Sequence, residues 1–265
     1  MSGRSIRGLF LLSCFIVLIA LPAEGQRRRA TRSAPGGLPT GQCHTFAFPK
    51  AGTKATYVTA SPQGNVNFTV TYISSSATQT KTTQAVTTPQ GSADVETTID
   101  TETIGSLQAT KRILTLTSTT VPVFGKLTTE VEITFAPSLT IGPSGGWCTG
   151  AKWTIPPVTQ TIVTRAPLAP PQTTIVTTFQ SEGEVLAVGE SITVPAGTFS
   201  TVKSKGTTSS GDTVSPAISW MSMEHNVSVR QDTLDAQGNV TSTTELTAFQ
   251  PGSSAIIGKE VSLDW

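Results

Sequence analysis

The chain has 265 residues, of which 37% are hydrophobic, 13% are charged and 47 are threonine. The charged share is about half of the ~25% that is usual in soluble globular proteins, and the composition excludes a coiled coil, a collagen and a highly charged disordered chain. The formal net charge of +1 gives no electrostatic basis for nucleic-acid binding. Because threonine is β-branched, its abundance favours strands.

Residues 1–25 predict a secretory signal peptide, because Arg4 and Arg7 precede an apolar stretch over Leu9–Leu21. That stretch is shorter than the ~20 residues that a transmembrane helix needs. We expect cleavage before Gln26, so that a bacterial cell exports the chain to the periplasm or the medium. The mature form is then expected to have no transmembrane span.

Two alternatives to cleavage stay open at this end of the chain. The sequence Leu11-Leu12-Ser13-Cys14 resembles a lipobox, which would place a lipid on Cys14. The basic residues that follow the apolar stretch weaken the charge asymmetry that orients a signal, which leaves an uncleaved anchor as the second alternative. Residues 26–40 hold four Arg among Pro and Gly and predict a flexible basic tail.

Residues 41–265 predict an antiparallel β domain, in which 12 basic and 16 acidic residues give a net charge of −4. Polar and apolar residues alternate, for example over 65–72 and 130–135, which places the apolar side chains on one face of each strand. Segments with Pro and Gly, such as 61–65 and 88–92, are typical of hairpin turns. About a dozen strands are expected, which is typical of one large curved antiparallel sheet, either a half-barrel or an open barrel.

A weak internal similarity predicts two related halves, 41–146 and 147–265. Gly52–Tyr57 and Gly150–Ile155 share Gly, Lys and Thr at the same positions, and each segment introduces a strand-rich region. Three identities in these short segments indicate the division but do not establish it.

Cys43 and Cys148 are the two cysteines that remain after cleavage, and we predict that they form a disulfide. The bond would close a loop of roughly 100 residues and stabilise the fold by about 4–5 kcal/mol in the chain-entropy model. It would also join the start of the first half to the start of the second. Two buried free thiols are the alternative.

Residues 142–146 read Gly-Pro-Ser-Gly-Gly and match the G-x-S-x-G pattern of serine hydrolases. In those enzymes the serine lies between a strand and a helix. The segment 147–150 that follows does not predict a helix, so we expect Ser144 to be a loop residue. No catalytic residue is predicted, and a secreted serine hydrolase is the weakest functional alternative.

Two groups of residues are candidate metal ligands, and we predict that neither binds a metal. The possible zinc ligands have no C-x-x-C or H-x-x-H pair, and adjacent residues in a strand point to opposite faces. The possible calcium ligands lie along a straight strand, which spreads their carboxylates apart. We interpret the acidic stripe as a solvated face that discourages edge pairing, and we predict no cofactor. The first group is Cys43, His44, Cys148 and His225, and the second is Asp94, Glu96, Asp100 and Glu102.

The C-terminal third contains a recognisable group of motifs. Residues 191–199 read Ser-Ile-Thr-Val-Pro-Ala-Gly-Thr-Phe, an aromatic strand follows around Trp220, and Thr-Glu-Leu lies at 244–246. This region resembles exported bacterial domains of unknown function that carry a V-P-A-G-T-F turn and are similar to the half-barrels of periplasmic lipoprotein carriers. The opening, 48–54, also resembles the start of such chains. The A-P-G-V-G segment of those domains is replaced here by Ser222–Asn226, which puts in doubt any function that depends on that loop.

The residues of this region also have an interpretation of their own. Pro195 and Gly197 predict a tight turn, and Phe199 and Trp220 are expected to pack in the core. The resemblance implies no catalytic residue.

Three functions therefore compete at this stage. The first is an exported non-enzymatic β protein that binds a hydrophobic ligand or an envelope protein on a concave apolar face. The second is a periplasmic lipid or lipoprotein carrier, which needs an open apolar cavity of ~300–1,000 Å³. The third is the hydrolase that depends on Ser144.

Overall fold

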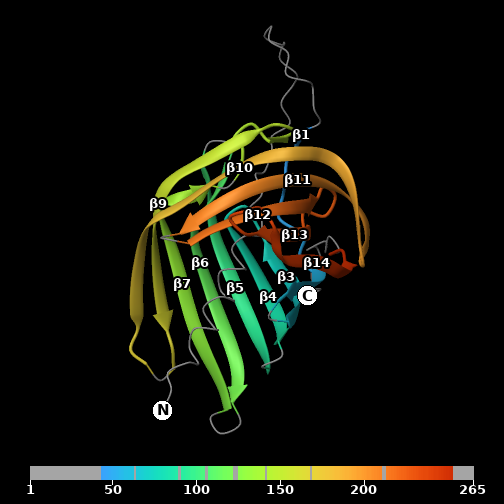
Figure 1. Cartoon of the computed structure of the whole chain (residues 1–265). Helices are drawn as coiled ribbons and strands as arrows, with labels where there is room; N and C mark the ends of the chain where they lie inside the picture. The colour runs from blue at the N-terminus through green and yellow to red at the C-terminus, as the bar shows by residue number, and fades with distance from the viewer. Residues whose placement is uncertain are drawn as a thin grey trace, which may run out of the picture.

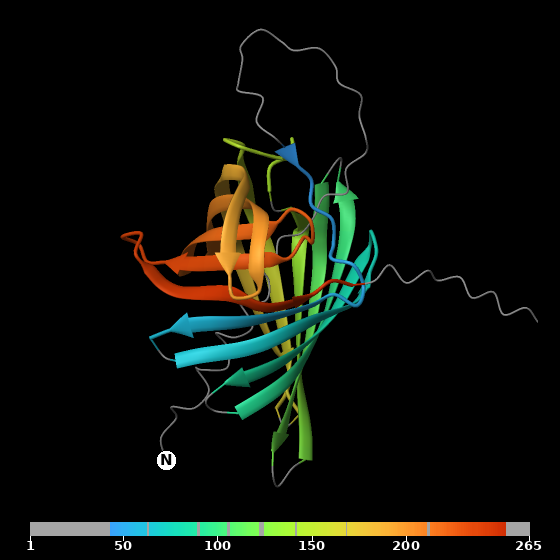
Figure 2. The same cartoon turned by 90° about the vertical axis from the view of Figure 1, so that its right-hand side faces the viewer.

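The computed structural model describes residues 43–252, except for residues 63, 89–90, 105–106, 122–124, 141, 168 and 211–212. The predicted signal peptide and basic tail therefore lie outside the described residues. Figures 1 and 2 show a deep curved body in which the strands of one wall cross those of the other at a steep angle. Within the described residues, no helix is long and apolar enough to cross a membrane.

The regular structure of the described residues consists of β-strands. These are β1 (Cys43–His44), β2 (Lys54–Ser61), β3 (Gly64–Ser75), β4 (Gln79–Thr88), β5 (Gly91–Ile104), β6 (Leu107–Val121), β7 (Gly125–Thr140), β8 (Trp147–Cys148), β9 (Lys152–Arg165), β10 (Gln172–Val194), β11 (Gly197–Ser210), β12 (Thr213–Ser222), β13 (Ser228–Leu234) and β14 (Val240–Gln250).

All of these strands except β1 and β8 form one closed antiparallel barrel, in the order β10-β11-β12-β13-β14-β2-β3-β4-β5-β6-β7-β9. The sheet closes because the long strand β10 pairs with β9 over its first part and with β11 over its second part. The predicted all-β fold with a large curved antiparallel sheet is confirmed. The two edges of that sheet meet, which gives most edge backbone groups a partner.

The alternation of residues along each strand separates a buried face from an outer face. In β4, the residues Thr80, Thr82, Gln84 and Val86 are buried, while those between them are exposed or half-buried. Threonine therefore fills part of the interior as well as the surface. This use of a β-branched, polar residue on both faces accounts for a composition that is rich in Thr and low in charge.

Buried apolar side chains gather in three clusters. The first joins β2 and β3 to β10 and β12–β14, the second joins β6 and β7 to β9, and the third lies beside β8. Their buried members are Ala55, Tyr57, Val70, Tyr72, Val194, Trp220, Val227, Val229 and Leu246 in the first, Ile113, Ile133, Phe135, Leu139, Ile155 and Val158 in the second, and Phe46, Trp147, Val185, Val202 and Met221 in the third.

The two predicted halves follow the same plan in the described residues. Each has a two-residue strand, β1 or β8, and then six barrel strands, β2–β7 or β9–β14. The Gly52 N–H donates to the Tyr72 carbonyl, and the Tyr72 N–H donates to the carbonyl of the residue after Gly52. In the same way, the Gly150 N–H donates to the Val185 carbonyl, and the Val185 N–H donates to the carbonyl of the residue after Gly150. These features agree with the division into halves, which stays a prediction.

The short strands β1 and β8 pair with each other outside the barrel. Cys43 lies opposite Cys148, and His44 lies opposite Trp147. The sulfur atoms of the two cysteines are 2.04 Å apart, so the predicted disulfide is confirmed. Their Cα atoms are 4.0 Å apart, and the bond spans a sequence separation of 105 residues. The disulfide therefore joins the starts of the two halves.

The turn between β10 and β11 contains the residues of the V-P-A-G-T-F motif. Pro195 and Ala196 form the turn, and Gly197 adopts a φ of 132°, a conformation that side chains disfavour. Trp220 is 8% exposed and belongs to the first buried cluster, against which Phe199 packs. The placement of these residues agrees with the prediction of a tight turn and two core aromatic side chains.

Candidate functional site

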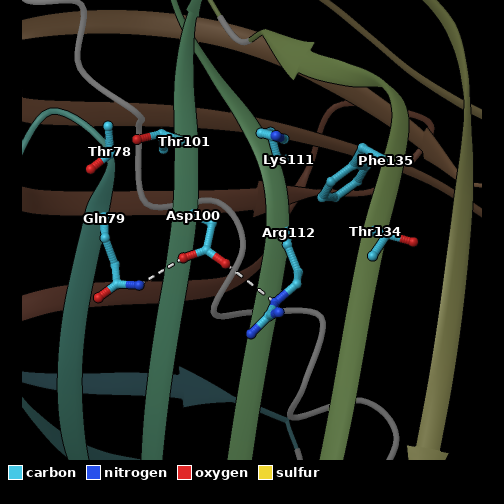
Figure 3. A pocket seen from close by; sticks show the side chains of 8 residues that line it. All are labelled: Thr78, Gln79, Asp100, Thr101, Lys111, Arg112, Thr134 and Phe135. Carbon is cyan, nitrogen blue, oxygen red and sulfur yellow. Dashed lines mark hydrogen bonds and ion pairs between the residues drawn. The ribbon is translucent and has the colours of Figure 1, made fainter.

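A cleft of about 650 Å³ lies on the wall formed by β4–β7 (Figure 3). At this level the β6–β7 ladder is interrupted. Thr110 of β6 pairs with Leu139, but Arg112, two residues further, pairs with Thr134, five residues earlier in β7. Beside the interruption, β7 pairs through Phe135 with β9. The two strands therefore separate locally, which leaves room for the cleft.

Polar and charged residues line most of this cleft. Thr134 lies opposite Arg112, and Arg112 lies opposite Asp100, so that the three share the outer face of the sheet. Thr101 and Phe135 are the next residues of their strands, point to the other face, and are 4% and 6% exposed. The full lining is Thr78, Gln79, Asp100, Thr101, Lys111, Arg112, Thr134 and Phe135.

Two local features bring these side chains together. A register shift in the β5–β6 ladder leaves Lys111 between the partners of Asp100 and Thr101, so both Lys111 and Arg112 reach the cleft. The turn before β4 is held against β5, because the Thr101 N–H donates to the Thr78 carbonyl at 2.9 Å. The Thr101 hydroxyl also donates to the carbonyl of Ala77, at 3.0 Å. The end of the cleft at β4 is thus fixed by hydrogen bonds.

A row of polar side chains crosses the mouth of the cleft from β4 to β7, as Figure 3 shows in part. The Gln79 amide donates to Oδ1 of Asp100 at 2.9 Å. Nε of Arg112 lies 3.3 Å from Oδ2 of Asp100 and 3.7 Å from Oε1 of Glu132. We call Gln79, Asp100, Arg112 and Glu132 the first-half row. It alternates donors and acceptors across four neighbouring strands.

The row continues onto β9 through Arg165. Nη1 of Arg165 donates to Oε2 of Glu132 at 3.2 Å and also to Glu130. These hydrogen bonds, the one to Glu132 first, raise the pKa of Arg165. Glu132 is therefore shared by two guanidinium groups, and its charge is balanced on both sides.

Arg112 differs from the other members of the first-half row because its charged group lacks a hydrogen bond. No hydrogen bond joins its guanidinium group to a described residue, and its Nε atom is buried without one; its contacts are the ion pairs with Asp100 and Glu132. The neighbouring Lys111 has only a long ion pair, 3.7 Å from Glu102, and its side chain is 56% exposed. The cleft thus holds N–H donors that its own protein residues do not use, beside carboxylates that are already paired.

The lining offers hydrogen bonds rather than reactive groups. It combines a carboxylate, an amide, two cations and three threonine hydroxyls, and it contains no His, Cys or Ser among the described residues. Sequence reasoning did not identify this site, although it did single out Asp100. The register of the β5–β6 and β6–β7 ladders brings Arg112 beside Asp100, and alternation along one strand carries no signal for that.

The structure places Ser144 in the turn between β7 and β8. The side chain is exposed, the Gly146 N–H donates to the Pro143 carbonyl at 3.2 Å, and the two-residue strand β8 follows. This is not the strand–serine–helix arrangement of the hydrolase pattern.

The candidate zinc ligands are not brought together as a metal site. Cys43 and Cys148 are joined to each other, and the described residues contain no group of three or more His, Cys, Asp or Glu placed to hold a metal. His44 packs edge-on against Phe46, and burial lowers the pKa of His44. His225 lies instead against Phe249, with ring centroids 4.6 Å apart.

The acidic stripe is not an edge-protecting face. Its strand, β5, is central, because it pairs with β4 on one side and β6 on the other. Three of its four carboxylates instead form cross-strand ion pairs: Glu96 with Lys81 at 2.7 Å, Asp100 with Arg112, and Glu102 with Lys111. The interpretation of this stripe as edge protection was wrong, because period-2 alternation does not distinguish a central strand from an edge strand.

Comparisons with known proteins give only distant similarities. No family model and no curated protein matches the chain. A solved structure titled "putative lipoprotein", from Parabacteroides distasonis ATCC 8503, is 15% identical with a TM-score of 0.34 and covers 79% of this chain and 100% of that chain. Another, titled "putative exported protein with YmcC-like fold", from Bacteroides fragilis NCTC 9343, is 12% identical with a TM-score of 0.38 and covers 78% and 100%.

Proposed function

We propose that this chain is an exported, non-enzymatic β-barrel protein that binds a hydroxyl-rich polar ligand, of the oligosaccharide class, in the cleft on β4–β7. The observation that carries the proposal is the guanidinium group of Arg112, which makes no hydrogen bond with a described residue and lies beside Asp100 and Gln79. Guanidinium, carboxylate and amide groups are planar and can each bond two neighbouring hydroxyls of a ligand. The threonine hydroxyls of the lining both donate and accept, as the hydroxyls of a sugar do.

A lipid or lipoprotein carrier is the second candidate. Such a carrier requires an open apolar cavity. The buried apolar side chains of this barrel pack against one another in three clusters, in which Val185, Val229 and Leu246 are 0% exposed. The cleft itself is polar at its mouth. Both observations favour a polar ligand over a hydrophobic one.

The lining of the cleft, the position of Ser144 and the disulfide also support the proposal. A cleft whose described lining lacks His, Cys and Ser, and an exposed Ser144 followed by β8 rather than a helix, support a binding role over hydrolysis. The Cys43–Cys148 disulfide is typical of proteins that fold in an oxidising compartment, which agrees with export.

The proposal is tested by titrating the isotope-labelled protein with three trisaccharides, maltotriose, chitotriose and trigalacturonate, and following backbone amide shifts by NMR. We expect at least one of them to shift amides near Asp100, Thr101 and Arg112. Arg112→Gln should abolish these shifts while the rest of the spectrum is retained. Lys81→Gln is the matched control, because Lys81 carries an ion pair on the same wall and does not line the cleft.

Two results would overturn the proposal. One is the absence of shifts near the cleft with all three saccharides. The other is binding of the apolar probe N-phenyl-1-naphthylamine with a large rise in its fluorescence that Arg112→Gln does not alter, which favours the carrier.

A further inference from the structure

The first part of β10 has a free edge. Gln172–Val176 pair with β9, whereas the pairing of β10 with β11 starts only at Gln180. In an antiparallel ladder, alternate residues direct their N–H and C=O groups to opposite sides of the strand. Gln172–Val176 therefore present one side without a strand partner in the described residues. Figure 1 shows this end of the β9–β10 hairpin extending beyond β11 and β12.

This edge lacks the features that normally block the addition of another strand. Gln172–Ile175 contain no charge, proline or glycine, and all four residues are exposed, Ile175 to 63%. Natural edges are usually protected by lysine, proline or a bulge within the strand. Here Pro171 comes before the segment, and the register shift between Val176 and Phe179 comes after it. The intervening residues have the composition that favours strand pairing.

We infer that this edge of β10, Gln172–Val176, pairs antiparallel with the same edge of a second copy of the chain. Two identical edges related by a twofold axis match in length and polarity, and an uncharged segment meets itself without repulsion. The pairing would place threonines of the two copies beside each other, which stabilises antiparallel ladders. It would also cover the exposed side chain of Ile175. A charged partner strand, by contrast, would find no opposite charge on Gln172–Ile175.

The paired segment is short, so the dimer is expected to depend on protein concentration. One strand separates this surface from the cleft, because Ile175 lies opposite Thr161 of β9, which lies opposite Thr134. The pairing does not involve Arg112 or Asp100. The dimer and the ligand-binding proposal can therefore fail independently.

Sedimentation velocity over a wide range of protein concentrations provides the first test. We expect the wild type to shift from monomer to dimer as the concentration rises, and Ile175→Lys to remain monomeric at every concentration. Val214→Lys is the matched control, because Val214 is an equally exposed apolar residue, at 61%, on another strand, β12, where it lies opposite Ser209 of β11. It should dimerise like the wild type, and all three proteins should have the same thermal unfolding midpoint within a few degrees.

Cross-linking provides the second test and locates the contact. Cys43 and Cys148 are joined, so Thr174→Cys introduces a thiol that a short bismaleimide can link across the twofold axis. We expect a covalent dimer from Thr174→Cys and none from Val214→Cys. A wild type that stays monomeric throughout overturns the inference. So does a dimer that survives Ile175→Lys, since the contact must then lie elsewhere.

Discussion

The two predicted halves of the barrel each contain a row of polar side chains, and the two rows are completed in different ways. In β4–β7, the first-half row ends with Arg112 beside Glu132. In β11–β14, Lys203, Trp220, Arg230 and Glu245 lie opposite one another in register. We call these four the second-half row. Trp220 occupies the place that Asp100 has in the first half.

The difference between the two rows lies in how each arginine is used. Arg230 bonds with all of its guanidinium nitrogens, to both carboxylate oxygens of Asp232 at 3.0 and 3.1 Å and to Glu245 at 3.1 Å. Its Cζ atom also lies 5.5 Å from the Trp220 ring centroid. Arg112 forms ion pairs with Asp100 and Glu132 but no hydrogen bond with a described residue. The guanidinium group of Arg230 is therefore fully hydrogen-bonded within the protein, whereas that of Arg112 can still donate hydrogen bonds to a ligand.

Register explains this difference. The β13–β14 ladder begins with Arg230 opposite Glu245 and continues to Leu234, with a shift of a single residue between Thr233 and Leu234. In the β6–β7 ladder, the interruption next to Arg112 adds three residues on β7, and the strands separate. The cleft therefore lies where the β6–β7 ladder is interrupted, next to Arg112.

The largest effect is expected from removing the bond that joins the two halves. Cys43→Ser with Cys148→Ser should lower the free energy of unfolding by about 4–5 kcal/mol, because the unfolded chain is released from a very long closed loop. Chemical denaturation of the two proteins measures the difference. Loss of the disulfide between β1 and β8 should leave the barrel ladders intact, so the far-ultraviolet circular dichroism spectrum should be unchanged. A loss below ~1 kcal/mol would show that the barrel itself holds the halves together.

Truncation of Trp220 is expected to have the next largest effect. Trp220→Ala should destabilise the barrel by about 3–5 kcal/mol, since it removes a buried ring and the surface on which Lys203 and Arg230 lie. Thermal and urea unfolding measure the loss. Trp220→Phe should recover more than half of it. A variant as stable as the wild type would contradict the view that the second half depends on this aromatic side chain.

Much of the fold was predictable from the sequence because the information is local. Alternation predicted strands at 65–72 and 130–135, which lie within β3 and β7, and the segment 61–65 joins β2 to β3. The disulfide was predictable because the predicted cleavage of residues 1–25 leaves only two cysteines. These features depend on the period of a strand, on turn residues or on a count.

Closure of the barrel and the cleft could not be predicted in the same way. Closure depends on which strands end beside each other: β10 closes the barrel because residues 181–184 pair with β9 on one side and with β11 on the other. The contact of Arg112 with Asp100 depends on the register of the β5–β6 ladder, and the room beside Arg112 depends on the register shift in the β6–β7 ladder. Neither register can be read from one strand alone. The acidic stripe was misinterpreted for this reason, because its position within the sheet is not encoded in its own alternation.

Replacing the two arginines tests the comparison directly. Arg230→Gln should lower the free energy of unfolding by about 2–3 kcal/mol, because Asp232, which is 5% exposed, loses its bidentate partner. Arg112→Gln should cost less than about 1 kcal/mol, since its guanidinium group is half-exposed and incompletely bonded. Urea unfolding of both variants measures the two losses under one condition. Equal losses would contradict the assignment of Arg112 to a binding role.

The smallest effect is expected from the ion pair between Lys81 and Glu96 on the outer face of the first half. Their charged atoms are only 2.7 Å apart, but the side chains are 37% and 38% exposed, so water screens the attraction and both side chains lose freedom when they pair. A double-mutant cycle with Lys81→Gln and Glu96→Gln should give a coupling of about 0.2–1 kcal/mol, which falls further in 1 M salt. A coupling above ~2 kcal/mol that salt does not weaken would show that outer-face charges hold the first half as firmly as Trp220 and Arg230 hold the second. The first-half row and the second-half row would then not differ in their contribution to the free energy of unfolding.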